Sequence, residues 1–441
     1  MKRQFKLLPL LTLTILCTLT VANKLFFSSV NATYVEGHIS QDTTWTLADS
    51  PYVVTKDLIV DPGVTLTINP GVEVRFGGNF ILAVEGRLSA IGTQDRMITF
   101  TSNKFQPQAG DWNTVKFNGT QQSTVAYSIV KYAVNGITIE NSTVEIKNCR
   151  ISDNSQNGIY ITGAVQTAIK DNVIRSNQNG ILLKYSTSGV NITDNEVFSN
   201  TQNGVYLHAC AYAEAKKDSD NVTATTRIHD ILISENNVSS NGNGIFLHSY
   251  SIANASYFWY VEAQANASMY DVTVSNNIIK SNTDNGMRVY SYAGNVFDAW
   301  YSGQRTQWAE AHAYVNAIIF GNILSANQKG IYESGQTGIS PSYANPLHSV
   351  VLAYESANIT RNSVSYNVCG VLFERATDNV ADYNDIYGNT YGMNLSLGAA
   401  VKAEYNYWGD PSGPYHLSLN PAGKGNPVNG DGCLLYTSPS P

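Results

Sequence analysis

Residues 172–207 read NVIRSNQNGILLKYSTSGVNITDNEVFSNTQNGVYL, and this stretch decides the fold. It contains the same unit twice: two asparagines five positions apart, then a glycine, then apolar residues one and three positions after that glycine. Asn172, Asn177 and Gly180 mark the first copy, and Asn195, Asn200 and Gly204 mark the second. Self-similarity at a fixed period indicates a repeat architecture, in which neighbouring units bury each other's hydrophobic faces.

Both markers recur along most of the chain. The repeat glycines are Gly136, Gly158, Gly180, Gly204, Gly244, Gly286, Gly330, Gly370 and Gly392, at spacings of 22, 22, 24, 40, 42, 44, 40 and 22 residues. The paired asparagines are Asn172, Asn177, Asn195, Asn200, Asn236, Asn241, Asn277, Asn282, Asn322, Asn327, Asn362, Asn367, Asn384 and Asn389. The first asparagine of each pair lies 8 or 9 residues before the next glycine. Every insertion therefore enters the unit at the same place, at about 209–228, 249–270, 291–314 and 335–356.

The hydrophobic period within a unit is two, which is typical of a half-buried strand. Two further short apolar stretches per unit predict three strands in about 22 residues. The sequence therefore predicts an all-β fold, a right-handed parallel β-helix, in which four consecutive coils carry insertions that stack as a lateral lobe. A leucine-rich repeat has a similar period, but it needs leucine-rich strands and a helical half, which the short units lack.

The asparagines are interpreted as a structural ladder in the turns. Asparagine tolerates the left-handed backbone conformation, and its amide can bond its own copy one coil away. The insertions contain half of the chain's tryptophans and many tyrosines. We expect these aromatic residues to form the core of the lobe, and an aromatic binding surface is the alternative.

Composition limits the function classes. The chain has 441 residues, of which 43% are hydrophobic and 14% charged, so it is not a disordered sequence. A net charge of −7 gives no basic surface for nucleic acid. Five cysteines cannot form a disulfide scaffold. We predict no disulfide among Cys149, Cys210 and Cys369.

The two ends are set apart from the repeats. Residues 1–32 predict a secretory signal with cleavage after Ala22 or Ala32, or else an N-terminal membrane anchor. We expect a cap and the first coils at 33–125, repeats at 126–400 and a closing segment at 401–432. The last nine residues, CLLYTSPSP at 433–441, match a translated sequencing adapter and are excluded as foreign. An exported chain is also consistent with N-x-S/T sequons at Asn118, Asn141, Asn191, Asn221, Asn237, Asn254, Asn266, Asn358 and Asn394.

Segments outside the repeats resemble a known family. Residues 62–68 (PGVTLTI) and 70–76 (PGVEVRF) are similar to the first coils of secreted prokaryotic β-helix proteins. Residues 406–414 (NYWGDPSGP) are similar to their closing segment. Over about 45–432 the chain resembles right-handed parallel β-helix repeat proteins, a group that includes NosD-like periplasmic proteins and pectate-lyase-like enzymes. The resemblance implies the fold, but this solenoid carries many functions.

The candidate binding residues lie on one strand of each coil. Side chains two and four positions after a repeat glycine point outward, because those at one and three point inward. Stacking places them in two columns, and we expect the lobe to wall this face into a groove. The candidates are Tyr160, Lys184, Tyr206, His208, Phe246, His248, Arg288, Tyr290 and Tyr332. The rings repeat once per coil and are flanked by His and Lys donors, an arrangement that suits a sugar chain. The alternative is that the lobe packs onto the rings and covers them.

No catalytic set is identified. The resemblance implies grouped aspartates in hydrolases, or calcium-binding aspartates with an arginine in lyases, and neither pattern is present. Glu140, Glu333 and Glu374 are expected to point outward and lie apart, although charged residues of the insertions leave an active site open. Copper, which a NosD-like chain would imply, needs clustered ligands, and only His208 and His248 align. We predict no metal and no cofactor.

The sequence therefore predicts a secreted or cell-surface solenoid with a structural or binding role, its partner a surface or environmental polysaccharide. The alternatives are a polysaccharide lyase or glycoside hydrolase, and a NosD-like factor for metal-cluster assembly. We expect no nucleic-acid partner, and membrane contact only through an anchor at either end.

Overall fold

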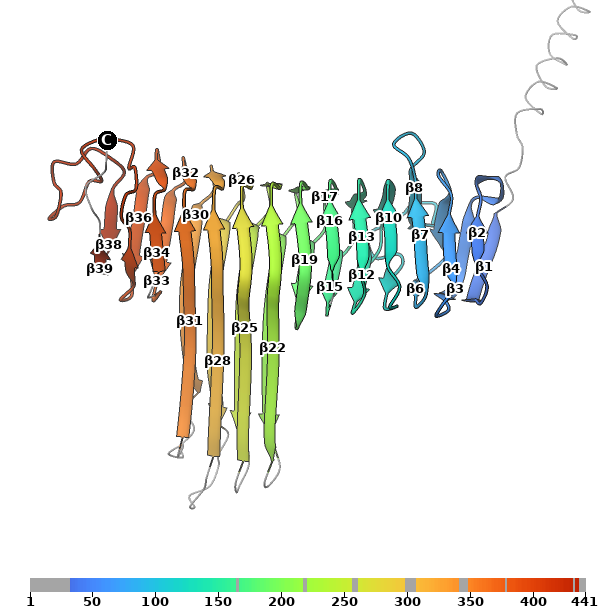
Figure 1. The fold of residues 1–441 in the computed structure, drawn as a ribbon, viewed down its shortest axis with the longest axis horizontal. Helices are drawn as coiled ribbons and strands as arrows, with labels where there is room; N and C mark the ends of the chain where they lie inside the picture. The colour runs from blue at the N-terminus through green and yellow to red at the C-terminus, as the bar shows by residue number, and fades with distance from the viewer. Residues whose placement is uncertain are drawn as a thin grey trace, which may run out of the picture.

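The computed structural model describes residues 32–163, 166–216, 220–255, 261–297, 307–340, 348–376, 379–430 and 433–435. The chain winds into a row of coils that runs from the N-terminal to the C-terminal end of an elongated molecule (Figure 1). Each full coil contributes three short strands, and every strand pairs in parallel with its counterparts in the neighbouring coils. This is a parallel β-helix, as the repeat predicts.

The strands form three stacks. Stack 1 contains β6 (Ile81–Val84), β9 (Thr114–Phe117), β12 (Ile137–Glu140), β15 (Asn157–Thr162), β18 (Asn179–Lys184), β21 (Asn203–Ala215), β24 (Asn243–Ala255), β27 (Asn285–Phe297), β30 (Lys329–Ser340), β33 (Cys369–Glu374), β36 (Tyr391–Ser396) and β38 (Val428–Gly430). Stack 2 contains β2 (Thr43–Trp45), β4 (Thr65–Ile68), β7 (Arg87–Ile91), β10 (Ser123–Ala126), β13 (Val144–Lys147), β16 (Thr167–Lys170), β19 (Thr187–Thr193), β22 (Asn221–Ser234), β25 (Val261–Ser275), β28 (Gln307–Phe320), β31 (His348–Thr360), β34 (Asn379–Asp382), β37 (Ala400–Lys402) and β39 (Cys433–Leu435). Stack 3 contains β5 (Glu73–Phe76), β8 (Ile98–Ser102), β11 (Ser128–Lys131), β14 (Arg150–Ser152), β17 (Val173–Arg175), β20 (Glu196–Phe198), β23 (Asn237–Ser239), β26 (Ile278–Lys280), β29 (Ile323–Ser325), β32 (Ser363–Ser365) and β35 (Asp385–Tyr387).

The N-terminal end starts with two longer strands. β1 (Thr33–Ile39) pairs with β3 (Tyr52–Val60), and β3 pairs with both β5 and β6, so it joins stacks 1 and 3. A short 3₁₀ helix, η1 (Leu47–Asp49), lies between β2 and β3. At the other end, β39 pairs with β37, so three of the nine residues that the sequence sets apart as foreign continue stack 2. Of the expected signal or anchor at 1–32, residues 1–31 lie outside the described residues.

The core is the inside of the coils. The residues one and three positions after a repeat glycine point inward, and Ile159, Ile161, Val205 and Leu207 have no exposed surface. The repeat glycine itself is required by close approach rather than by backbone angle, since a Cβ at Gly158 would lie 2.7 Å from the carbonyl oxygen of the next coil's glycine. Each coil therefore buries its apolar face only against its neighbours.

The predicted asparagines form two buried ladders. In each ladder the side-chain Nδ2 donates to the Oδ1 of the asparagine in the next coil, as in Asn172 to Asn195 (2.9 Å) and Asn177 to Asn200 (3.1 Å). The left-handed backbone conformation, however, belongs to the residue directly before each ladder asparagine, such as Asp171 (φ 56°) and Ser176 (φ 56°). The expectation that asparagine itself takes this conformation is wrong, because its amide must point into the coil.

The structure also contains a third ladder that the sequence analysis missed. Its members directly precede the repeat glycines, and they are Asn135, Asn157, Asn179, Asn203, Asn243 and Asn285. Here each Nδ2 donates to the preceding coil, as in Asn203 to Asn179 (2.7 Å), so this ladder runs opposite to the other two. The Asn-Gly dipeptide repeated six times was the signal for it.

The four insertions extend the coil strands. β21, β24, β27 and β30 continue stack 1, and β22, β25, β28 and β31 continue stack 2, so the long strands project from one side of the row (Figure 1). The register of the β21–β24 pair runs without a break from Val205↔Ile245 to Ala215↔Ala255. We call this extension the fin; it consists of the described residues within 209–227, 249–268, 291–314 and 335–354. The inserted residues thus widen two existing sheets instead of forming a separate lobe.

Small side chains fill the space between the two sheets of the fin. Ala209, Ala211, Ala213 and Ala215 of β21 face inward, as do the alanines of β25 and β28. The two sheets are also joined by side-chain bonds to backbone carbonyls, such as Ser249 Oγ to the Ala267 oxygen (2.9 Å). The expectation that aromatic residues form this core is wrong for the described residues, because they occupy the alternate outward positions. Tyr212 of the fin has 51% of its surface exposed.

Candidate functional site

All nine predicted binding residues lie on the outer face of stack 1, which we call the ring face. The first column runs through Tyr160, Leu182, Tyr206, Phe246, Arg288 and Tyr332 in successive coils. The second column runs through Lys184, His208, His248 and Tyr290, and it continues into Ser334. The structure therefore brings the predicted residues together in two adjacent columns.

The rings of this face stack on one another. The ring centroids of Tyr206 and Phe246 are 4.9 Å apart with planes 8° from parallel, and those of His208 and His248 are 4.6 Å apart at 7°. A further pair, Tyr250 and Tyr292, continues the array onto the fin at 5.2 Å. Because each ring covers the face of its neighbour, the array presents ring edges rather than flat ring faces to a ligand.

Polar atoms at the ring edges are partly paired within the face. The Tyr206 hydroxyl lies 2.9 Å from Nδ1 of His248, and the Tyr290 hydroxyl donates to Oε1 of Gln336 at 2.9 Å. The Tyr332 hydroxyl donates to the carboxylate of Glu374. In contrast, Nε2 of His208 and Nε2 of His248 are buried without a hydrogen-bond partner.

Cations lie against the rings of this face. The guanidinium of Arg288 lies over the rings of Phe246 (4.8 Å), Tyr290 (5.0 Å) and Tyr332 (5.5 Å), a cation–π arrangement. Lys184 lies 4.8 Å from the centroid of the Tyr185 ring.

The histidines do not add to this charge at neutral pH. Burial lowers the pKa of His208 to about 4. Burial, the neighbouring His208 and Arg288 lower that of His248 to about 3. Both imidazoles are therefore neutral there.

The fin does not wall the ring face. Residues after His208 stay in parallel register with the next coil through Ala215, so the fin lies in the plane of the same sheet. The predicted groove is therefore replaced by a flat face, about twice as wide in the four fin coils as elsewhere. The alternative in which a lobe packs onto the rings is also wrong, since the rings are covered by each other.

The three predicted outward carboxylates differ in their placement. Glu140 forms an ion pair with Lys116 at 2.9 Å, and Glu374 accepts from Tyr332, so both are outward as expected. Glu333 is fully buried and faces Glu355 inside the coil, because it takes the inward position that holds Val289 in the preceding coil. The expected outward position of Glu333 is therefore wrong. Of the charged insertion residues, Asp218, Asp298 and Arg305 lie outside the described residues.

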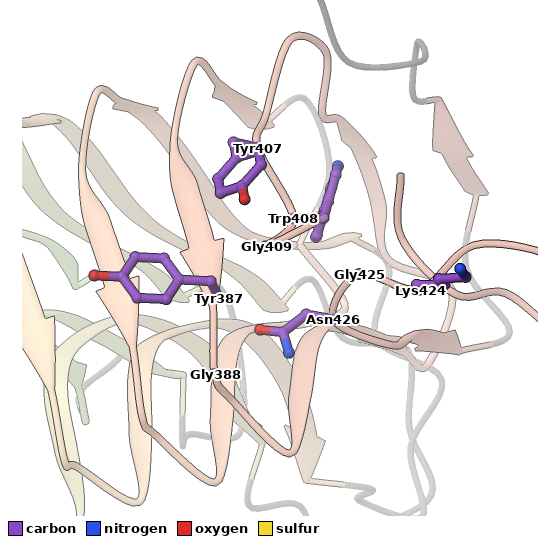
Figure 2. Close-up of a pocket in the computed structure, with 8 residues that line it drawn as sticks. All are labelled: Tyr387, Gly388, Tyr407, Trp408, Gly409, Lys424, Gly425 and Asn426. Carbon is purple, nitrogen blue, oxygen red and sulfur yellow. The ribbon is translucent and has the colours of Figure 1, made fainter. Parts of the chain in front are cut away.

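A hollow that the sequence analysis missed lies at the C-terminal end. Its volume is about 410 Å³, and it lies between the end of β35 and the closing segment (Figure 2). It is lined by Tyr387, Gly388, Tyr407, Trp408, Gly409, Lys424, Gly425 and Asn426. Asn426 also ends a ladder, since it accepts from Nδ2 of Asn389 at 3.0 Å. The NYWGDPSGP motif predicts a closing segment but not a hollow. Its residues line only one side of the hollow, and residues 424–426, which lie outside the motif, line another.

Sequon asparagines lie at the surface to different degrees. Asn118, Asn141, Asn191, Asn221 and Asn358 are exposed, whereas Asn237, Asn254, Asn266 and Asn394 are partly buried. Their glycosylation stays a prediction.

Two family models match parts of the chain, which is a parallel β-helix repeat protein by its fold. Residues 96–258 match the model described as periplasmic copper-binding protein (NosD), and residues 37–124 match that of a pectate-lyase-like β-helix domain. A curated relative, Protein bark beetle of Drosophila melanogaster, is 40% identical over 65 residues. Those residues are 15% of this chain and 2% of that protein, so the chain spans a small fraction of its length.

Solved structures share the fold. The crystal structure of the Dettilon tailspike protein matches with a TM-score of 0.51 and 13% identity, over 84% of this chain and 62% of that chain. This chain therefore spans less than two thirds of the tailspike protein. A hyperthermoactive exopolygalacturonase from Thermotoga maritima matches at 10% identity and a TM-score of 0.42, over 80% of this chain and 83% of that one.

The described residues do not fit the copper named in the NosD family description. No group of three or more His, Cys, Asp or Glu side chains in the described ranges could hold a metal ion. The stacked rings of His208 and His248 are nearly parallel, so their unpaired Nε2 atoms point side by side and not at a common centre. Cys149, Cys210 and Cys369 are free thiols, and Cys149 is buried.

Proposed function

We propose that this chain is a secreted β-helix protein that binds a polysaccharide along the ring face. The observation that carries the proposal is the continuous column of ring edges with Lys184 and Arg288, repeated at one coil per step on a flat, uncovered sheet. A sugar chain would pack along the ring edges, and Lys184 and Arg288 would bind its hydroxyl or acidic substituents. The extended chain of a polysaccharide matches a site that is long and shallow.

Binding is favoured over catalysis by the placement of the carboxyl groups. Glycoside hydrolysis needs two carboxyl groups facing one sugar bond. On the ring face, Glu140 and Glu374 lie on β12 and β33, many coils apart, and both are engaged. The carboxyl pair Glu333 and Glu355 lies inside the coil, out of reach of a polymer.

The C-terminal hollow is a second position for the same ligand class. Its volume exceeds that of a single sugar ring, and Tyr407 (41% exposed) and Lys424 offer an aromatic side chain and a cation beside a floor of glycines. The end of a sugar chain would fit there.

Affinity electrophoresis through gels that contain single polysaccharides tests the proposal. We expect at least one polysaccharide to retard the wild type. The double variant Lys184→Ala, Arg288→Met should bind that polysaccharide at least tenfold more weakly with an unchanged melting temperature. The matched control, Lys170→Ala with Arg175→Met, removes the same charges from stacks 2 and 3 and should bind as the wild type does. A wild type that no polysaccharide retards, or a double variant that is retarded equally, would contradict the proposal.

A further inference from the structure

The fin has open sheet edges on both sides. On the N-terminal side, β18 pairs with β21 only as far as Lys184↔His208, and β19 pairs with β22 only from Thr187↔Ile228 onward. On the C-terminal side, β33 pairs with β30 only as far as Ser334↔Glu374, and β34 pairs with β31 only from Asn358↔Val380 onward. Within the described residues, the fin parts of β21, β22, β30 and β31 therefore have a strand neighbour on one side only. Backbone N–H and C=O groups on an open edge can pair with another chain.

The two open sides differ in how they are protected. On the N-terminal side, Thr226 Oγ1 donates to the Cys210 carbonyl (2.7 Å) and Ser186 Oγ accepts from the Arg227 N–H (3.3 Å). Charged Glu214 and Arg227 lie in the same edge strands. Capping and charge are the usual devices that keep an edge from pairing.

The C-terminal side has fewer of these devices: Asn295 Nδ2 donates to the Val350 carbonyl (3.0 Å), and the carboxyl group of Glu355 points inward at the root of the open part of β31. Residues 335–338 (GQTG) of β30 and 349–354 (SVVLAY) of β31 contain no charge and no proline. Leu352 points outward and is 48% exposed, while Val351 and Ala353 point inward but are only partly buried. A β-branched, uncharged open segment of this kind is a strong pairing surface.

We propose that the C-terminal side of the fin is a homodimer interface, in which β31 pairs with β31 of a second copy and β30 with β30, both antiparallel about a two-fold axis. The coils that follow the fin do not extend as far down as β31 does (Figure 1). The space below these coils, beside β31, would therefore hold the inverted fin of the second copy. A two-fold axis perpendicular to the sheets keeps each stack in line with its own copy.

A second copy fits this edge better than a single peptide strand. Two edges, one in each sheet, are open side by side, and one strand could fill only one of them. Pairing centred on Leu352 places Leu352 opposite its own copy and Val350 opposite Tyr354, so the outward apolar residues meet apolar residues. An edge about 23 Å long and roughly 20 Å thick would bury about 1,000 Å² in total, which reaches the lower end for a specific interface.

Sedimentation velocity at micromolar concentrations tests the proposal. We expect the wild type to have about twice the mass of one chain and Leu352→Lys to have the mass of a single chain, with at least a tenfold loss in association and an unchanged melting temperature. The matched control is Asn266→Lys, in the same cross-strand row but two strands inside the edge, and it should remain dimeric. A monomeric wild type at tens of micromolar would overturn the proposal, and so would a dimeric Leu352→Lys.

A cross-linking variant supports the result where Leu352→Lys fails to fold. Cα atoms opposite one another across an antiparallel pair lie within disulfide range. Leu352→Cys should therefore form a disulfide-linked dimer on mild oxidation, while Gln264→Cys, inside the fin sheet, should not. Absence of that cross-link in a folded Leu352→Cys chain would contradict the two-fold register.

Discussion

Asn277 shows how much a single amide does in this fold. Its Oδ1 accepts from the backbone and the side chain of Asn236, each at 2.9 Å, and its Nδ2 lies within 3.0 Å of the Ile233, Ser275 and Asn322 oxygens. The side chain has no exposed surface. One residue thus connects three successive coils, and each partner would lose its bond in a buried place if the amide were removed.

Replacing this amide should be costly. Asn277→Leu should lower the free energy of unfolding by about 4 kcal/mol, because several buried polar partners lose hydrogen bonds at roughly 1–3 kcal/mol each. Denaturant unfolding followed by circular dichroism measures the change. Asn237→Leu is the control, since the next coil already carries Ile278 at the equivalent position and the change should stay within about 0.5 kcal/mol. Equal effects of the two variants would show that the ladder does not stabilise the coils.

The buried carboxyl pair is the second feature at this scale. Glu355 accepts from the Ser291 N–H at 3.1 Å and from the Ser291 hydroxyl, while neither oxygen of Glu333 has a hydrogen-bond partner. Burial raises the pKa of Glu355 to about 7, and burial with the neighbouring Glu355 raises that of Glu333 well above its ordinary value of 4.5. Both groups are therefore held as neutral acids in weakly acidic solution.

This pair predicts a pH dependence of stability. The folded chain keeps the Glu355 proton up to about pH 7, whereas the unfolded chain releases it near 4.5, so unfolding becomes easier as the pH rises through that window. Relative to Glu355→Gln, the wild type should lose roughly 3 kcal/mol between pH 4.5 and 7. Urea unfolding of both proteins at each pH measures the difference between their free energies of unfolding. Both proteins contain the same histidines, so the contribution of the histidines cancels in this difference. A difference that does not change with pH would mean that Glu355 is solvated.

Sequence reasoning identified two ladders because asparagine at a fixed spacing is unmistakable in the printed sequence. It missed the third because Asn-Gly was interpreted only through the glycine. It expected Glu333 to point outward, because a carboxyl group at an inward position carries the cost of burying a charge. The strand pairing Val289↔Glu333 shows that Glu333 points inward, where it lies beside Glu355.

At the scale of elements, the fin depends on small side chains. Its two sheets face each other through alanine and serine, so added volume on the inner side has no space. Ala265→Leu should destabilise the protein by about 1–3 kcal/mol through overpacking, measured by thermal unfolding. Gln264→Leu, the next residue but on the outer face, should cost less than about 0.5 kcal/mol. A tolerated Ala265→Leu would indicate that the two sheets are not in contact.

The ring array is also an element with its own stability. Phe246 is 8% exposed and packs between the ring of Tyr206 and the guanidinium of Arg288. Phe246→Ala should cost about 3 kcal/mol, measured by denaturant unfolding, because it removes a buried ring and leaves a gap in the column. Leu182→Ala, in the same column, is a smaller deletion and should cost less. A Phe246→Ala protein of wild-type stability would show that the ring stands free of its neighbours.

The sequence could not show that the insertions are strands of the same sheets. Alternating alanine and polar residues carry a weak hydrophobic signal, so residues 209–215 do not resemble the strongly apolar strands of the coils. The spacing fixed where each insertion enters, but a separate lobe and a widened sheet begin at the same position. Similarly, outward positions were predicted from the period, whereas the orientation of the rings follows from contacts between coils.

At the scale of the whole molecule, the solenoid presents a long flat face on stack 1 and a separate hollow at its C-terminal end. Among the described residues we find no helix with the length and hydrophobicity needed to cross a membrane. The lysines are distributed so that they report on these surfaces separately. Lys184 lies on the ring face, Lys170 and Lys402 lie on stack 2, and Lys424 lines the hollow.

Lysine acetylation read by mass spectrometry therefore tests the central proposal most directly. The protein is labelled with and without the polysaccharide that retards it most strongly in affinity electrophoresis. Binding along the ring face predicts that the polysaccharide protects Lys184 several-fold while Lys170 and Lys402 react as before. Unchanged labelling of Lys184, with protection of Lys424 or of the stack 2 lysines instead, would contradict the assignment of the ring face as the binding site.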